Sequence, residues 1–323
     1  MNTNNIKSWT PLFTSIMKLL HYGIKIIEPN ATILRIITNM RVDKIIYSKP
    51  KYIKYHKVIT NTNKTIGEWI WNTNKITDIK SHSKYIFYIH GGAFCAGNMY
   101  NIRGFLYQLA KKTNVVIFSA NYKKAPEYKH PIPLTDCIEG FTYFINQIKN
   151  IDEKPTIIIM GDSAGGNLSI NLIAHLIKSN LLIPSACILI SPWVNLSDCN
   201  NSSSWIDNEK YDFVKYEFAK YFAFEYINQE TNTLEDVSPL YLHDDILIKF
   251  PPILIEYGEY ETLRDQIQEF SIKLEKLGLN ITYNSRYEMT HNYPMFYFTK
   301  ILQANDFFCS VKKFIKKIEN LNI

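Results

Sequence analysis

The amino-acid sequence predicts an α/β fold with a doubly wound, mostly parallel sheet. From residue 84 onward, short apolar runs alternate with longer helical patterns, and most of the runs are followed by Gly, Pro or Asn. Near-continuous apolar strands are typical of a parallel sheet buried on both faces. Alternation of such strands with helices is typical of βαβ units, which build doubly wound sheets.

Six strands are predicted, each short and rich in Ile, Val or Tyr, at residues 85–89, 115–121, 156–160, 186–190, 253–257 and 281–287. Helices are predicted from apolar periodicity at residues 166–179, 262–277 and 306–318. The chain has 323 residues and neither an internal repeat nor a low-complexity linker, so a single domain spanning residues 1–323 is expected.

Two segments do not follow the strand–helix alternation. Residues 1 to about 45 have the pattern of one or two helices, and residues 197–236 contain a helical stretch dense in Tyr and Phe. We expect these segments to pack together as a cap above the carboxyl ends of the strands. The alternative is that the aromatic residues belong to the ordinary core.

Composition and charge exclude several classes of protein. Hydrophobic residues make up 46% and charged residues 20% of the chain, which argues against disorder. The net charge is +6, but the lysines are scattered, whereas nucleic-acid binders concentrate charge on one face. No nucleic-acid partner is therefore expected. Attraction to an anionic membrane and assembly into a homodimer are both left open.

The cysteines and the N-terminal segment indicate an intracellular protein. The five cysteines include no Cys-x-x-Cys pair, which favours buried free thiols over disulfides or a zinc site. The start of the chain lacks the pattern of a secretory signal, and residues 13–27 read as an amphipathic helix because Lys18, His21 and Lys25 interrupt them. A cytoplasmic location is expected.

The strongest chemical signal is a nucleophile elbow. Residues 156–167 read TIIIMGDSAGGN, a strand followed by the G-x-S-x-G motif that turns into a helix. Gly161 and Gly165 keep this tight turn free of side chains, so that the Ser163 hydroxyl stands above the sheet edge. The turn also aims the N–H of Ala164 to where negative charge would develop. Ser163 is therefore the predicted nucleophile.

A second signal follows the strand at 85–89, in the segment HGGAF at residues 90–94. Its backbone N–H groups would be free to stabilise an oxyanion, which is worth roughly 2.7–4 kcal/mol for each donor. The alternative is a plain glycine turn.

A serine nucleophile needs a base and an acid that orients it, in the chain order Ser, acid, His. Three histidines follow Ser163, and among them His291 lies after the last predicted strand, where the base is expected. We expect His175 to be structural and His243 to lie in a loop. For the acid, spacing alone leaves Glu261 and Asp265 open.

Together these motifs resemble those of the hormone-sensitive-lipase-like carboxylesterases of the α/β-hydrolase superfamily. The resemblance covers about residues 85–298 and rests on HGGAF at 90–94, NYKKAPEYKHPIP at 121–133, GDSAGGN at 161–167, SPW at 191–193, SPL at 238–240, PP at 251–252, ETLRD at 261–265 and His291.

The resemblance implies an eight-stranded sheet with a helical cap and esterase activity that needs no metal or organic cofactor. It implies that Ser163, Glu261 and His291 are nucleophile, acid and base, and that Glu127 and Asp136 are structural. It also implies an oxyanion region that comprises Gly91, Gly92, Ala93 and Ala164, with Gly92 and Ala93 as N–H donors from the loop. This chain departs from the family's pattern at three places: it has Glu261 in place of the commoner Asp, Ala93 in place of a third glycine, and Lys123-Lys124 before Ala-Pro-Glu.

The function expected from the sequence is hydrolysis of short- to medium-chain acyl esters of small molecules through an acyl-enzyme. Two alternatives stay open. One is a lipid or sterol deacetylase that acts at membranes, and the other is a catalytically silent small-molecule binding protein with the same fold.

Overall fold

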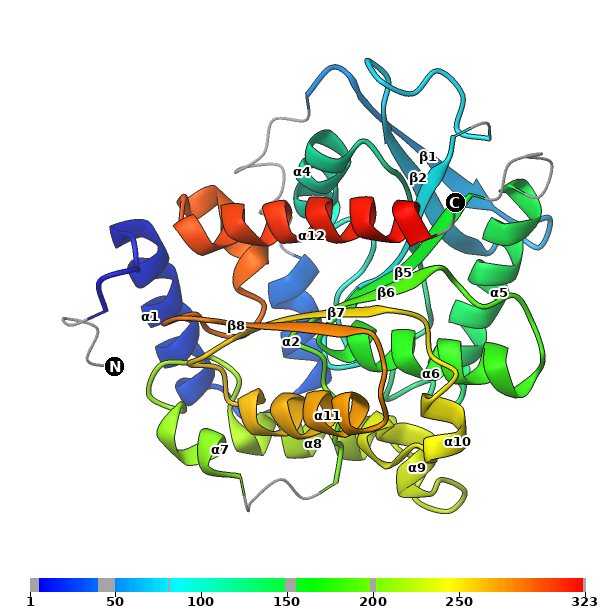
Figure 1. Cartoon of the computed structure of the whole chain (residues 1–323). Helices are drawn as coiled ribbons and strands as arrows, with labels where there is room; N and C mark the ends of the chain where they lie inside the picture. Colours follow the sequence, from blue (N-terminus) through cyan, green and yellow to red (C-terminus); the bar gives the residue numbers. More distant parts are fainter. Residues whose placement is uncertain (1–5, 40–49, 81, 149–154, 198–201, 322–323) are drawn as a thin grey trace.

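A computed structural model describes residues 6–39, 50–80, 82–148, 155–197 and 202–321 of the chain. Within these residues lies one eight-stranded sheet with the strand order β1-β2-β4-β3-β5-β6-β7-β8 (Figure 1). The strands β1 and β2 pair antiparallel, as do β2 and β4, and all the other pairs are parallel. The strands are β1 (Ile53–Ile59), β2 (Thr65–Asn72), β3 (Lys84–Ile89), β4 (Val116–Ala120), β5 (Thr156–Asp162), β6 (Ala186–Ile190), β7 (Ile253–Gly258) and β8 (Ile281–Arg286).

The predicted doubly wound sheet is confirmed, and all six predicted strands are present within two residues of their expected ends. The sequence reasoning did not locate β1 and β2. Only two residues of β1 are buried, because it is the edge strand, and its sequence IKYHKVI therefore lacks the apolar run of a buried strand.

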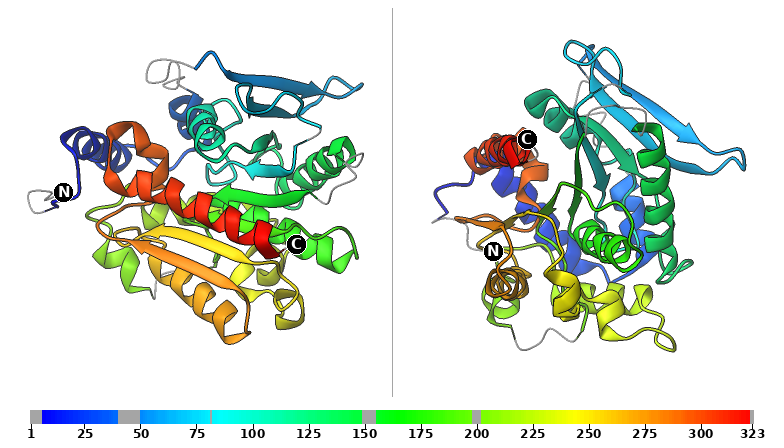
Figure 2. Two further views of the ribbon diagram at one scale, coloured as in Figure 1. Left: turned by 45° about the horizontal axis from the view of Figure 1, so that its top comes forward. Right: turned by 45° about the vertical axis from the view of Figure 1, so that its right-hand side comes forward.

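Helices cover both faces of the sheet (Figure 2). In chain order the helices are α1 (Pro11–Ile26), α2 (Ala31–Asn39), α4 (Arg103–Thr113), α5 (Ile132–Ile148), α6 (Ala164–Lys178), α7 (Ser203–Asp207), α8 (Tyr216–Tyr226), α9 (Leu234–Val237), η1 (Pro239–Tyr241), α10 (Asp244–Leu247), α11 (Arg264–Lys276), η2 (Tyr293–Thr299) and α12 (Leu302–Leu321). The helices predicted at 166–179, 262–277 and 306–318 correspond to α6, α11 and α12.

Alternate side chains of each central strand enter two different apolar cores. In β3, Phe87 packs with residues of α5 and α6 on one face, whereas Ile86 packs with residues of α4, α12 and α1 on the other. This two-sided burial follows from the two-residue period of a strand. It explains why the central strands have continuous apolar sequences.

The segment at 197–236 differs from its prediction. In place of one helical stretch, α7 and α8 are separated by residues 208–215, which are not helical. Within this break the Asn208 Nδ2 donates to the backbone oxygens of Glu259 (3.1 Å) and Glu261 (2.9 Å). The polar side chains in the break are therefore bonded to the loop after β7, which sequence periodicity does not reveal.

Other expectations have mixed outcomes. Cys95, Cys137 and Cys187 are buried free thiols, as predicted, but Cys309 is exposed because it lies on the outer side of α12; Cys199 lies outside the described residues. Residues 1–5, 40–45 and 198–201 of the expected cap also lie outside them. None of the helices in the described ranges is both long and apolar enough to span a bilayer.

Candidate active site

Ser163 occupies a strained turn between β5 and α6. Its backbone has φ 52° and ψ −121°, a conformation that residues with a side chain adopt only where the surroundings enforce it. A Cβ at Gly161 would lie 2.3 Å from the backbone oxygen of Gly165, and a Cβ at Gly165 would lie 2.1 Å from the backbone oxygen of Ile89. Both positions therefore require glycine, in agreement with the predicted elbow.

His291 lies in the loop between β8 and η2, and its Nε2 is 2.9 Å from Ser163 Oγ. Tyr293 holds this loop in place, because its hydroxyl donates a hydrogen bond to Glu256 at 2.9 Å. Arg286 donates a hydrogen bond to the same Glu256 carboxylate. Burial lowers the pKa of His291 below its ordinary 6.5, so the imidazole is neutral near pH 7. A neutral imidazole in this position can accept the serine proton.

Of the two acid candidates, only Glu261 lies beside His291. Its Oε2 is 3.9 Å from His291 Nδ1, longer than a hydrogen bond, and accepts hydrogen bonds from Ser191 Oγ (2.6 Å) and the Gly258 N–H (3.2 Å). Burial raises the pKa of Glu261. Asp265 instead accepts hydrogen bonds from Ser202, Ser203 and Ser204 next to α7.

The HGGAF loop contains two unused backbone donors, and both residues line the cavity beside Ser163. Within the described part of the chain, the N–H groups of Gly92 and Ala93 have no acceptor, and neither does that of Ala164. The Gly91 N–H differs, because it donates to Asp162 Oδ1 at 2.9 Å. Of the four residues predicted for the oxyanion region, Gly91 is therefore not available as a donor.

Asp162, the residue before the nucleophile, joins three parts of the site, and the sequence reasoning missed this role. Its buried carboxylate accepts hydrogen bonds from Tyr88 (2.6 Å), from the Gly91 N–H and from Asn292 Nδ2 (2.9 Å). Burial raises the pKa of Asp162 to about 6. The turn at Ser163, the loop at residues 90–94 and the loop that carries His291 are thereby bonded to one side chain.

Asp212 is a second buried carboxylate that the sequence did not reveal. It accepts hydrogen bonds from the backbone N–H groups of Phe213 (2.8 Å), Thr262 (2.9 Å) and His291 (3.4 Å), and burial raises its pKa to about 6. It ties the break between α7 and α8 to the loops that carry His291 and Glu261. The only signal for it in the sequence was its position, since Asp212 is an acidic residue inside a segment rich in Tyr and Phe that has a helical pattern.

The remaining residues singled out from the sequence lie apart from the serine. His175 lies near the end of α6, and His243 is exposed next to Asp245. Glu127 forms an ion pair with Arg35 of α2, and Asp136 is buried and accepts hydrogen bonds from Lys64 and the Lys123 N–H. None of them lines the cavity beside Ser163.

The cavity beside Ser163 has a volume of about 210 Å³ and mostly apolar walls. Its lining includes the polar or glycine residues Thr38, Gly92, Ser163, His291 and Asn292. The apolar part of the lining comes from α1, α2, the break before α8 and α8 itself: Ile24, Leu34, Phe213, Val214, Phe218, Ala219 and Phe222, with Ala93, Trp193 and Leu263.

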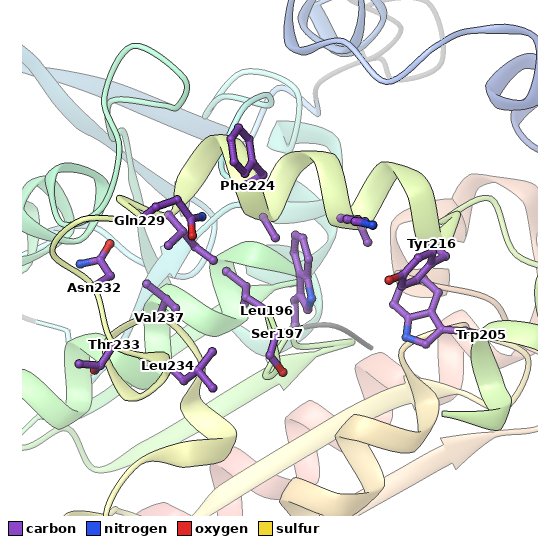
Figure 3. Close-up of a pocket in the computed structure, with 15 residues that line it drawn as sticks. Leu196, Ser197, Trp205, Tyr216, Phe224, Gln229, Asn232, Thr233, Leu234 and Val237 are labelled. Atoms are coloured by element: carbon purple, nitrogen blue, oxygen red, sulfur yellow. The ribbon is translucent and has the colours of Figure 1, made fainter. Parts of the chain in front are cut away.

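A second cavity, of about 390 Å³, lies on the other side of Trp193 and Ala219, which line both cavities. Figure 3 shows Trp205 and Tyr216 at one end of it and Gln229 and Asn232 at the other, with α8 running along its edge. The Trp193 indole and the small Ala219 side chain therefore form the wall between the two cavities.

Comparison with known proteins agrees with this geometry. A family model described as the α/β-hydrolase fold matches residues 86–295. The chain belongs to the α/β-hydrolase family. An esterase of Acinetobacter venetianus is 30% identical over 218 residues, which are 67% of this chain and 69% of that protein. An acetyl-hydrolase of Streptomyces hygroscopicus is 24% identical over 66% of this chain and 69% of its own.

Among solved structures, an esterase from the bacterial hormone-sensitive lipase family superposes with a TM-score of 0.81. The alignment covers 95% of this chain and 98% of that one, at 22% identity. The family resemblance predicted for this α/β-hydrolase from its HGG and GDSAGG motifs is therefore confirmed.

Proposed function

We propose that this α/β-hydrolase is a serine carboxylesterase that hydrolyses short- to medium-chain acyl esters of small molecules. The observation that carries the proposal is the contact of 2.9 Å between Ser163 Oγ and a buried, neutral His291 at the wall of an apolar cavity. The esterases and the acetyl-hydrolase among its relatives are consistent with this reaction class.

The first half of the reaction is acyl transfer to Ser163. His291 Nε2 takes the hydroxyl proton while Ser163 Oγ attacks the ester carbonyl, and the oxyanion is stabilised by the N–H groups of Gly92, Ala93 and Ala164. The C–O bond of the ester then breaks, and His291 gives its proton to the departing alcohol. In the second half, His291 activates a water that releases the acid and restores the serine.

Glu261 orients His291 and stabilises its charged form in this scheme. The separation of 3.9 Å closes to a hydrogen bond when His291 becomes an imidazolium, because the two opposite charges attract within a buried site. Ser191 Oγ donates to Glu261 Oε2, the same oxygen that faces His291 Nδ1, and so holds the carboxylate in place. Ser191 is thus a positioning residue.

Helices over the serine act as a substrate cap in this proposal. The cap comprises the segments at about 1–45 and 197–236, and side chains of α1, α2 and α8 line the catalytic cavity. The cavity volume of about 210 Å³ is below the roughly 300–1,000 Å³ typical of small-molecule sites. This size supports a small acyl group.

The test is hydrolysis of p-nitrophenyl esters from acetate to octanoate by the wild type and by Ser163→Ala. We expect turnover by the wild type and no measurable enzymatic rate for the variant. A fluorophosphonate should label the wild type at Ser163 and leave the variant unlabelled. If the wild type hydrolyses no ester and takes no label, the chain is a silent binding protein on the same fold and the proposal fails.

A further inference from the structure

The first helix, α1, has two apolar faces, of which only one packs on the core. Phe13, Met17 and His21 are its buried residues. Four other large side chains are exposed: Leu12 (51%), Leu19 (73%), Tyr22 (46%) and Ile26 (85%). At 3.6 residues per turn these four positions fall within an arc of about 80°, on the side opposite the buried face. Figure 1 shows α1 at the periphery of the molecule.

Helix α2 repeats this arrangement. Leu34 and Thr38 line the catalytic cavity, whereas Ile33, Ile36 and Ile37 point away from it and are 37%, 61% and 40% exposed. Single exposed apolar residues are normal on a protein surface, but an apolar stripe on each of two consecutive helices, interrupted on α1 by Ser15, indicates a surface that binds something.

The charges around these stripes indicate what binds. Residues 1–42 contain five basic residues and a single acidic one, Glu28. Lys18 and Lys25 border one side of the stripe of α1, and neither has an ion pair with any described residue. An outward apolar stripe bordered by lysines is the pattern of helices that lie in the interface of an anionic membrane.

We propose that the outer faces of α1 and α2 form a docking surface for anionic lipid membranes. Leu19, Ile26 and Ile36 enter the headgroup layer, and Lys18 and Lys25 contact its negative charges. Because the inner faces of the same two helices line the catalytic cavity, docking places that cavity beside the lipid surface. Esters that partition into the membrane are thereby brought to the enzyme.

Co-sedimentation of the full-length protein with vesicles tests the proposal independently of catalysis. Vesicles of phosphatidylcholine with roughly 30% phosphatidylserine are compared with pure phosphatidylcholine, at about 0.05 M and about 0.5 M salt. We expect binding to the anionic vesicles that weakens at high salt. The variant Leu19→Asn/Ile26→Asn/Ile36→Asn should bind at least tenfold less.

The matched control is Leu181→Asn/Leu182→Asn/Ile183→Asn, which changes three exposed apolar side chains (50%, 50% and 42%) between α6 and β6. This control should bind as the wild type does. Hydrolysis of soluble p-nitrophenyl butyrate by both triple variants reports whether they fold.

Three results would overturn the docking surface. The wild type fails to bind anionic vesicles, or both triple variants bind equally, or the wild type forms a dimer that the α1–α2 variant dissociates while no vesicle binding is seen. The last result, read by sedimentation velocity at several protein concentrations, would assign the surface to a second copy of the chain.

Discussion

The wall between the two cavities predicts how the substrate range can be changed. Trp193 is held by two hydrogen bonds to backbone oxygens. Its backbone N–H donates to the carbonyl oxygen of Ser163 at 3.1 Å, and its indole N–H donates to the carbonyl oxygen of Asn195 at 2.8 Å. Trp193→Ala removes the indole that separates the catalytic cavity from the space of about 390 Å³ behind it. A longer acyl chain can then extend from one cavity into the other.

The expected gain follows from the methylene groups that leave water. Each buried methylene contributes about 0.8 kcal/mol, which corresponds to roughly a fourfold change in an equilibrium or rate. If three or four methylenes of a decanoate chain enter the second cavity, the ratio of kcat/KM for decanoate to that for butyrate rises by about 50- to 200-fold. Loss of the buried indole also costs about 3–5 kcal/mol of stability, but a ratio of two substrates does not depend on the folded fraction.

The assay is the profile of kcat/KM over p-nitrophenyl esters from acetate to laurate. The matched variant is Ala223→Phe, because Ala223 lines only the second cavity. Alone, it should leave butyrate hydrolysis within about twofold of the wild type, and combined with Trp193→Ala it should cancel the gain for long chains. If Trp193→Ala lowers kcat/KM equally for every chain length, the wall does not set the substrate range and the reasoning is refuted.

Three further predictions concern the acid, the base and a buried ion pair. Glu261→Gln should lower kcat for p-nitrophenyl butyrate by about 10²- to 10⁴-fold, because His291 loses its orienting carboxylate. Asp265→Asn should retain kcat within about threefold of the wild type. Equal losses in the two variants would contradict the assignment of Glu261 as the acid. Because burial lowers the pKa of His291, the base stays neutral as the pH falls, so the acidic limb of kcat/KM should lie below pH 6.5; a midpoint above pH 7 would contradict this. Glu68→Gln leaves the Arg103 guanidinium without its buried charged partner. Urea denaturation of this variant should show a loss of about 3–5 kcal/mol in the free energy of unfolding. A loss under 1 kcal/mol would show that the ion pair is dispensable.

The sequence by itself determined the parts of this protein that depend on local pattern. The central strands could be located because a strand buried on both faces must be apolar throughout. The elbow at Ser163 could be located because its strained turn tolerates only glycine at residues 161 and 165. The order of serine, acid and histidine along the chain left three histidines, and the position after the last predicted strand selected His291 as the predicted base.

Only the tertiary structure decided which distant side chains meet. Glu261 and Asp265 are four residues apart, and just one of them lies beside His291, because the backbone after β7 turns toward the histidine loop before α11 begins. Asp162 and Asp212 act through backbone N–H groups of segments 50 or more residues away, and no local pattern encodes such partners. Periodicity reports burial within one element, whereas a site is made where several elements end.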